Sequence, residues 1–131
     1  MNNISQHIKS YKKVYPQIYS YILPDRKVTD GSQKIGYTER ENVDERILQQ
    51  VKTAAFKEKY EKLWSAPAFF EGGQESFMDK TFHKFLVKKG IEKKIDLGEE
   101  WFYFNGEPFK SKDLFDLFRK EIFAAIQNDS K

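Results

Sequence analysis

The 131-residue chain contains no cysteine, which excludes disulfide bonds and metal sites built on thiolates. Its two histidines, His7 and His83, lie far apart in the sequence and are not spaced as a zinc-binding pair. No apolar run approaches the roughly 20 residues that a membrane-spanning helix needs, and no secretory signal opens the chain. These absences predict a cytoplasmic protein without a membrane partner.

The chain also lacks a strong excess of one charge, because 23 basic residues are nearly matched by 20 acidic ones and the net charge is +3. This balance permits nucleic-acid binding but does not require it. Aromatic residues make up 16% of the chain and include twelve phenylalanines, which predicts a compact core rather than a base-stacking surface. The length predicts a single domain over residues 1–126, with a core at about 15–105, a C-terminal helix at 112–126 and a polar tail at 127–131 as a candidate linker.

The segment from Pro16 to Arg46 has the most informative local pattern. Residues 17–23 are rich in β-branched and aromatic side chains, and residues 33–38 form a second short apolar run, so the pair predicts a β-hairpin. A helix is predicted next, because apolar residues recur at helical spacing behind Asn42, a good N-cap residue; they are Val43, Ile47, Leu48 and Val51. Arg46 would lie in the second turn of that helix, beside the hairpin.

Two strands and a helix in this order, with these residues, resemble the start of the GIY-YIG nuclease domain. Gln17-Ile18-Tyr19 stands at the family's first triplet and Lys34-Ile35-Gly36 at its second, while Thr38 and Arg46 match the family threonine and arginine. Residues 77–84 and 98–102 resemble the branch found at the N-terminus of restriction-type and phage-related DNA helicases. The resemblance covers about residues 15–105 and implies an α/β (α+β) fold, with a small three-stranded, largely antiparallel sheet flanked by helices.

The resemblance gives Tyr19 a role at the nucleophilic water, as a base or a proton relay. A phenolate can do this if a nearby cation lowers its pKa, and Lys34, where the family commonly has tyrosine, is a candidate for that cation. The structural alternatives are an ordinary strand aromatic for Tyr19 and a solvated lysine for Lys34. Tyr37 is a further catalytic candidate, but in a regular strand it points to the face opposite Lys34. Both can reach one site only if the strand bends or ends near Gly36.

Arg46 is the strongest catalytic candidate. A guanidinium offers a planar fork to a phosphate and keeps its charge, so it can stabilise the extra negative charge of a phosphoryl transition state. Its structural alternative is a solvated residue on the exposed side of the helix. Contacts to nucleic acid are predicted for Arg46, Lys34 and Lys84.

The resemblance also implies one carboxylate that binds Mg²⁺ or Mn²⁺, and Asp79 stands at that position. Ser76 and Asp79 together also have the spacing of a capping box, in which the acid only caps a helix. Glu75 is the alternative metal ligand in that case. His83, one helical turn after Asp79, could orient the carboxylate or the leaving group, or could pack as a buried ring; Glu100 is a weaker polar candidate.

The remaining elements are predicted from local pattern. The helical spacing before Trp64 could continue as one long helix, but the resemblance implies a helix ending near Thr53 and a strand over about Lys59 to Ser65, and we adopt the second interpretation. The other predicted elements are a short helix over residues 4–15, a helix from Ser76 to Gly90, a strand over Trp101 to Phe104 with a turn at Asn105-Gly106, and a last helix capped by Ser111.

These features predict a divalent-metal-dependent endonuclease that hydrolyses DNA phosphodiesters. The branch that the chain resembles is usually fused to a helicase motor, and this chain has no Gly-rich phosphate loop, so a helicase or ATPase domain is expected in a longer natural chain. Two alternatives remain open at this point. One is a catalytically inactive DNA-binding module, and the other is a protein-interaction adaptor whose aromatic residues line a partner groove.

Overall fold

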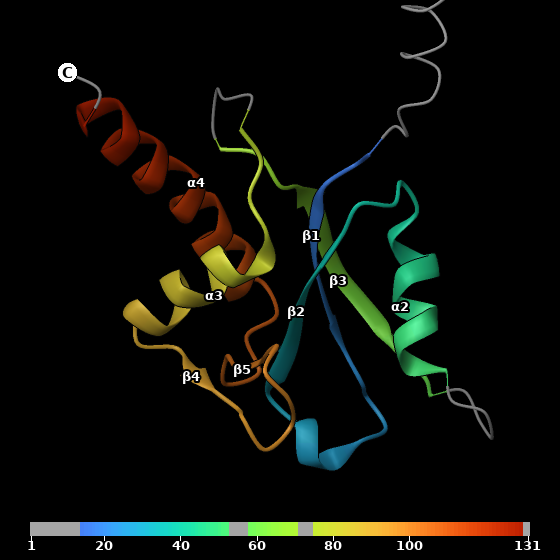
Figure 1. Ribbon diagram of the computed structural model, residues 1–131. Coiled ribbons are helices and arrows are strands. Elements are labelled where there is room, and N and C mark those ends of the chain that lie inside the picture. The colour runs from blue at the N-terminus through green and yellow to red at the C-terminus, as the bar shows by residue number, and fades with distance from the viewer. Residues whose placement is uncertain (1–13, 53–57, 71–74, 130–131) are drawn as a thin grey trace, which may run out of the picture.

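A computed structural model describes residues 14–52, 58–70 and 75–129, with side chains up to residue 121 (Figure 1). The helix predicted over residues 4–15 falls mainly on residues 1–13 and so lies outside the described part. The strands are β1 (Gln17–Ile22), β2 (Ser32–Thr38), β3 (Glu61–Pro67), β4 (Glu92–Lys93) and β5 (Trp101–Tyr103). The helices are α2 (Val43–Val51), α3 (Asp79–Lys88) and α4 (Lys110–Asp129), and a 3-10 turn, η1 (Lys27–Thr29), joins β1 to β2.

The strands form one antiparallel sheet in the order β3-β1-β2-β5-β4. The predicted α+β class is therefore confirmed, but the predicted number of three strands is wrong, because the described sheet has five. The strand predicted at Trp101 extends the sheet by pairing with β2. Strand β4 was not predicted, because its two residues are too few to give an alternating pattern.

The segment after α2 confirms the interpretation as helix and strand rather than one long helix. Helix α2 ends at Val51, and β3 pairs with β1 from Glu61 to Pro67 with one register shift between Ser20 and Tyr21. The N-cap is also confirmed, since the side chain of Asn42 accepts a hydrogen bond from the backbone N–H of Glu45 at 3.3 Å. Pairing with β1 thus overrides the helical spacing in this segment.

Two predicted helix starts are wrong. Helix α3 begins at Asp79, and Ser76 lies before it in an extended bridge with Phe69, so the predicted capping box does not form. Ser111 lies inside α4 and is buried; its hydroxyl donates to Gln33 Oε1 at 2.6 Å and accepts from the indole N–H of Trp64 at 2.8 Å. The serine is therefore held by tertiary partners instead of capping a helix. Helix α4 also continues to Asp129, so the predicted helix end at 126 and tail start at 127 are too early.

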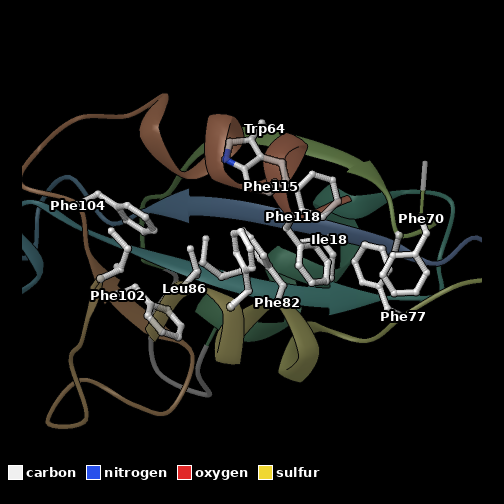
Figure 2. Packing of buried hydrophobic residues seen from close by; sticks show 14 residues of the cluster. Ile18, Trp64, Phe70, Phe77, Phe82, Leu86, Phe102, Phe104, Phe115 and Phe118 are labelled. Carbon is white, nitrogen blue, oxygen red and sulfur yellow. The ribbon is translucent and has the colours of Figure 1, made fainter. Parts of the chain in front are cut away.

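Helices α3 and α4 cover one face of the sheet and α2 covers the other, as Figure 1 shows. The larger core lies under α3 and α4, where phenylalanines from both helices meet the inward residues of the strands (Figure 2). Its buried members include Ile18, Ile35, Trp64, Phe70, Phe77, Phe82, Phe85, Leu86, Phe102, Phe104, Phe115 and Phe118. The prediction that the aromatic residues fill a core is confirmed for this set. No helix within the described ranges is long and apolar enough to cross a membrane.

The smaller core lies under α2 and contains Tyr19, Tyr21, Val43, Ile47 and Trp101. Strand alternation explains this division, because Ile18 and Tyr19 are neighbours in β1 and point to opposite faces. This second, thinner layer holds the first of the predicted site residues.

Candidate active site

Tyr19 packs directly over Gly36, its partner across the β1–β2 pair. A Cβ atom added to Gly36 would lie 2.5 Å from the Tyr19 hydroxyl oxygen and 2.7 Å from its Cε1 atom, so only glycine leaves room for the ring. Tyr19 is fully buried, and its hydroxyl has no hydrogen-bond partner among the described residues. The glycine of the second triplet therefore serves to seat the tyrosine of the first.

The surroundings of Tyr19 keep its phenol protonated. The pKa of Tyr19 is raised to about 12, first by burial and then by the Glu100 carboxylate, while the Arg46 guanidinium opposes both. The phenol is consequently neutral near pH 7, which does not fit a phenolate base and leaves the relay role. Arg46 is half-buried on α2, on the side of the sheet that Tyr19 faces.

Helix α2 is fixed in place by polar contacts to β3 and the segment before it. The carboxylate of Asp44 accepts from the Tyr60 hydroxyl at 2.7 Å and from Lys62 Nζ at 2.8 Å. On the same helix, Gln50 accepts from the hydroxyl of Tyr21 at 3.1 Å. These contacts fix the position of α2, and with it the position of Arg46, relative to the sheet.

Lys34 and Tyr37 do not share a face. Strand β2 runs regularly to Thr38, so Lys34 lies on the Tyr19 side and Tyr37 packs against the larger core. Lys34 Nζ is 3.5 Å from Glu100 Oε1 and 6.0 Å from the centre of the Tyr21 ring. The lysine is therefore neutralised by Glu100, and it is not among the groups that shift the pKa of Tyr19.

Tyr37 lies at an open hollow of about 700 Å³ that Arg46 and Met78 also line. Its hydroxyl donates to Glu39 Oε2 at 3.0 Å. Burial, the bond to Glu39 and the nearby Asp79 carboxylate raise the pKa of Tyr37 to about 12. Tyr37 is thus a neutral group at the rim, close to both Arg46 and the start of α3.

Asp79 and His83 line a second hollow of about 370 Å³, next to Glu99 and Glu100. Asp79 is buried at the first position of α3, and its Oδ2 atom is 3.9 Å from His83 Nε2. His83 is also buried and donates from Nε2 to the carbonyl oxygen of Ile35 at 2.8 Å. The histidine thus ties α3 to the centre of β2, and Asp79 lies one helical turn before it.

Glu100 lies close to a group from each face of the sheet, Lys34 on the α2 side and Asp79 on the α3 side. Its backbone carbonyl accepts from the N–H of Ile35 at 2.8 Å, which places its side chain between Lys34 and Asp79. Burial raises the pKa of Glu100, the Lys34 ammonium opposes this, and the Asp79 carboxylate raises it again. Two carboxyl groups therefore lie close together in a partly buried place. From the sequence, Glu100 was only a weaker candidate, because its position near Lys34 and Asp79 depends on the pairing of β5 with β2.

Two further predicted residues, Lys84 and Glu75, lie on α3 and in the segment before it. Lys84 is exposed and lines the hollow of Asp79. Glu75, the alternative metal ligand, lies in the extended segment before α3, where its carbonyl accepts from the N–H of Phe70 at 3.1 Å. It is exposed and is not part of the Asp79 hollow.

Lowering the pH should destabilise the fold through His83. Burial lowers the pKa of His83 below its usual 6.5, although the bond to Ile35 and the Glu100 charge oppose this. The unfolded chain therefore takes up a proton near pH 6.5 that the folded chain does not, so the free energy of unfolding should fall as the pH drops below 6.5. The slope of this loss is at most about 1.4 kcal/mol per pH unit.

Urea unfolding at a series of pH values between 7.5 and 5.5 measures this slope. In the His83→Gln variant, whose amide can still donate to Ile35, the slope should be shallower. An equal slope in both proteins would assign the acid sensitivity to other groups.

Comparison with known proteins identifies a relative that covers most of the chain. The chain is 30% identical over 126 residues to the "Putative type II restriction enzyme and methyltransferase RM.MpnORF109P N-terminus" of Mycoplasma pneumoniae, with 86% of this chain and 75% of that protein covered. No family model and no solved structure matches the chain. The described residues contain no group of three or more histidines and carboxylates that could hold a metal ion. By the extent of the match, the chain belongs to the family of this restriction enzyme and methyltransferase N-terminus.

Proposed function

We propose that the chain is a DNA endonuclease domain of the GIY-YIG type that acts in a restriction system. The name of the Mycoplasma relative supports a restriction role. The residues Tyr19, Gly36 and Arg46, taken from the resemblance, support the specific type of nuclease. No family model supports the assignment to GIY-YIG, so it depends on these residues and their geometry.

The observation that carries the proposal is the line of charged and polar groups along one edge of β2. Tyr19 is close enough to Arg46 and Glu100 for both to shift its pKa. Glu100 is in turn close to Lys34 and Asp79. Neighbouring groups from β1, β2, α2, α3 and the residue before β5 thus form a chain of pairwise contacts and charge interactions, although they come from distant parts of the sequence.

Each group has a chemical role in this proposal. Arg46 binds the scissile phosphate and stabilises the charge that develops on it. Tyr19 stays neutral, and its hydroxyl, which has no hydrogen-bond partner among the described residues, would orient the attacking water by a hydrogen bond. Lys34 holds the Glu100 carboxylate in place.

The carboxyl groups of Asp79 and Glu100 fit a divalent cation. Burial raises the pKa of Glu100, the Lys34 ammonium opposes this and the Asp79 carboxylate raises it again, so a cation bound near both carboxyl groups would favour the ionised form of Glu100. Mg²⁺ commonly takes one or two carboxylates together with water and phosphate oxygens, so two ligands are enough. When bound, such an ion supplies Lewis-acid stabilisation of the phosphate and of the leaving oxygen. We assign Asp79 and Glu100 to hold it.

The larger chain in which the domain works is also part of the proposal. The relative's name pairs a restriction enzyme with a methyltransferase. The helicase or ATPase domain expected from the sequence has no counterpart in that name. We therefore propose a restriction enzyme as the natural setting, with DNA as the substrate.

One observation favours a second candidate, a DNA-binding module without catalysis. Tyr19 is 0% exposed, so its hydroxyl reaches a water or phosphate only if Arg46 or the surrounding loops move. The adaptor alternative has less support, because the aromatic residues that would line a partner groove are mostly buried in the two cores.

Cleavage of supercoiled plasmid tests the proposal directly. The folded domain should nick the plasmid with Mg²⁺ or Mn²⁺ and should stop when EDTA is added. If it does not, the domain should be fused to its natural C-terminal neighbour, where one exists, and assayed again. Plasmid binding without cleavage in both forms would replace the nuclease by the inactive DNA-binding module.

A further inference from the structure

Positive charge is concentrated in one short segment of this nearly neutral chain. Residues 80–94 contain six lysines and one glutamate, a net charge of +5, whereas the whole chain carries +3. The remainder of the chain is therefore net negative. A protein with this asymmetry presents one basic side to a polyanion.

The lysines of α3 lie in a row. Lys80, Lys84 and Lys88 are spaced four residues apart, so they share one side of the helix, and all three are exposed. The only carboxylate of α3 is the buried Asp79. At 1.5 Å per residue, the row extends about 12 Å along the helix axis. We call these three residues the lysine ridge.

The ridge lysines differ in their partners from the six described lysines that have an acidic partner, which are Lys34, Lys62, Lys89, Lys94, Lys110 and Lys112. Within the described residues, no carboxylate lies within 4.0 Å of Lys80, Lys84 or Lys88. The six with an acidic partner include Lys89 with Glu121 at 3.3 Å, Lys94 with Glu92 at 3.5 Å and Lys112 with Asp116 at 2.8 Å. In the part of the chain that the structure describes, the ridge thus carries three positive charges without an acidic partner.

The ridge begins at the candidate site. Lys80 and Lys84 line the hollow of Asp79, and Lys84 and Lys88 line the adjoining hollow of about 330 Å³ over Phe85. A strand whose scissile phosphate lies at Asp79 would therefore continue along α3. Because one strand of duplex DNA carries a phosphate about every 3.4 Å along the axis, 12 Å corresponds to three or four phosphates.

We propose that the lysine ridge binds the phosphate backbone of duplex DNA beside the site of cleavage. This inference rests on the proposed nuclease function and adds the direction in which the DNA leaves the site, along α3 toward Lys88. Of the three ridge lysines, Lys84 was already predicted from the sequence to contact nucleic acid, together with Arg46 and Lys34. The ridge contributes affinity that does not depend on base sequence, since its partners are phosphates.

The salt dependence of DNA binding tests the ridge. Binding of the folded protein to a duplex oligonucleotide is measured in EDTA, so that nothing is cut, over a range of salt concentrations. Each phosphate contact adds about 0.9 to the slope of log affinity against log salt. The slope for the variant K80Q/K84Q/K88Q should therefore be less steep than that of the wild type by about 2.7. The variant K80R/K84R/K88R, which keeps the three charges, should have the slope of the wild type.

The control is K89Q/K94Q/K112Q, which removes the same charge from lysines that already have acidic partners. Its slope should change by less than about 1, because those lysines contribute little to phosphate binding. An equal decrease in slope for the two triple variants would overturn the proposed role of the ridge, because it would show only an effect of total charge. A wild type that cuts plasmid and a ridge variant with an unchanged slope would overturn the ridge alone. A wild type that binds no duplex would overturn both the ridge and the proposed function.

Discussion

Replacing Arg46 by alanine should lower the rate of DNA cleavage by about a hundredfold or more, which corresponds to roughly 3 kcal/mol of transition-state stabilisation. Binding of uncut DNA should weaken far less, because the guanidinium opposes charge that grows mainly as the phosphate reacts. Arg46 lies half-buried beside the neutral Tyr19, so its field is less screened than that of a surface arginine. The measurements are single-turnover nicking of plasmid and duplex binding in EDTA.

Arg40 provides a matched control, since it is exposed and lines the same hollow as Arg46. Arg40→Ala removes the same charge and should change the nicking rate only a few-fold. Arg46→Lys should recover little of the lost rate, because an ammonium lacks the planar fork. Equal rates in Arg40→Ala and Arg46→Ala would show that the hollow attracts DNA without Arg46 acting on the reacting phosphate.

The sequence predicted the parts of the fold that short-range signals determine. The β1–β2 hairpin follows from two apolar runs with a polar turn, and the start of α2 follows from the bond between Asn42 and Glu45. The turn at Asn105 and Gly106 is likewise confirmed, since both residues have positive φ angles, 55° and 76°. Each of these features is determined within a few residues.

The parts that the sequence predicted wrongly depend on distant partners. Serine is a common N-cap residue, yet the hydroxyl of Ser111 makes hydrogen bonds to Gln33 and Trp64. Ser76 has the spacing of a capping box, yet its backbone pairs with Phe69. In both cases a tertiary contact competes with the local signal, and the local pattern carries no information about that partner.

The same division holds for the candidate site. Tyr19, Lys34 and Arg46 were proposed from their order in a motif, and the structure places Arg46 near Tyr19. Glu100 was ranked low because nothing near it in the sequence marks it. Its position between Lys34 and Asp79 depends on the pairing of β5 with β2, a contact between segments more than 60 residues apart. The raised pKa of Tyr19 was also not foreseen, because burial of a phenol is a property of packing.

Replacing Gly36 by alanine should destabilise the fold by about 3 kcal/mol and disable cleavage. The new Cβ would lie 2.5 Å from the Tyr19 hydroxyl oxygen, well inside contact distance. The ring cannot move aside freely, because Tyr19 is fully buried and stacks on Tyr21 at 6.2 Å between centroids. Overpacking of this kind costs about 1–3 kcal/mol and occasionally more. Urea unfolding measures the loss of stability, and plasmid nicking measures the loss of activity.

A double-mutant cycle with Tyr19→Leu identifies the cause of this loss. Gly36 lies in a regular strand without a positive φ, so alanine itself fits the backbone and should slightly stabilise a strand relative to glycine. In the Tyr19→Leu background, where the ring and hydroxyl that the Cβ would meet are absent, Gly36→Ala should therefore be neutral or stabilising by up to about 1 kcal/mol. The coupling free energy between the two sites should then be about 3 to 4 kcal/mol, at or just above the upper end for residues in contact. A coupling near zero would mean that Gly36 serves the backbone of β2 and does not seat Tyr19, and the pairing of the two triplets would lose its physical explanation.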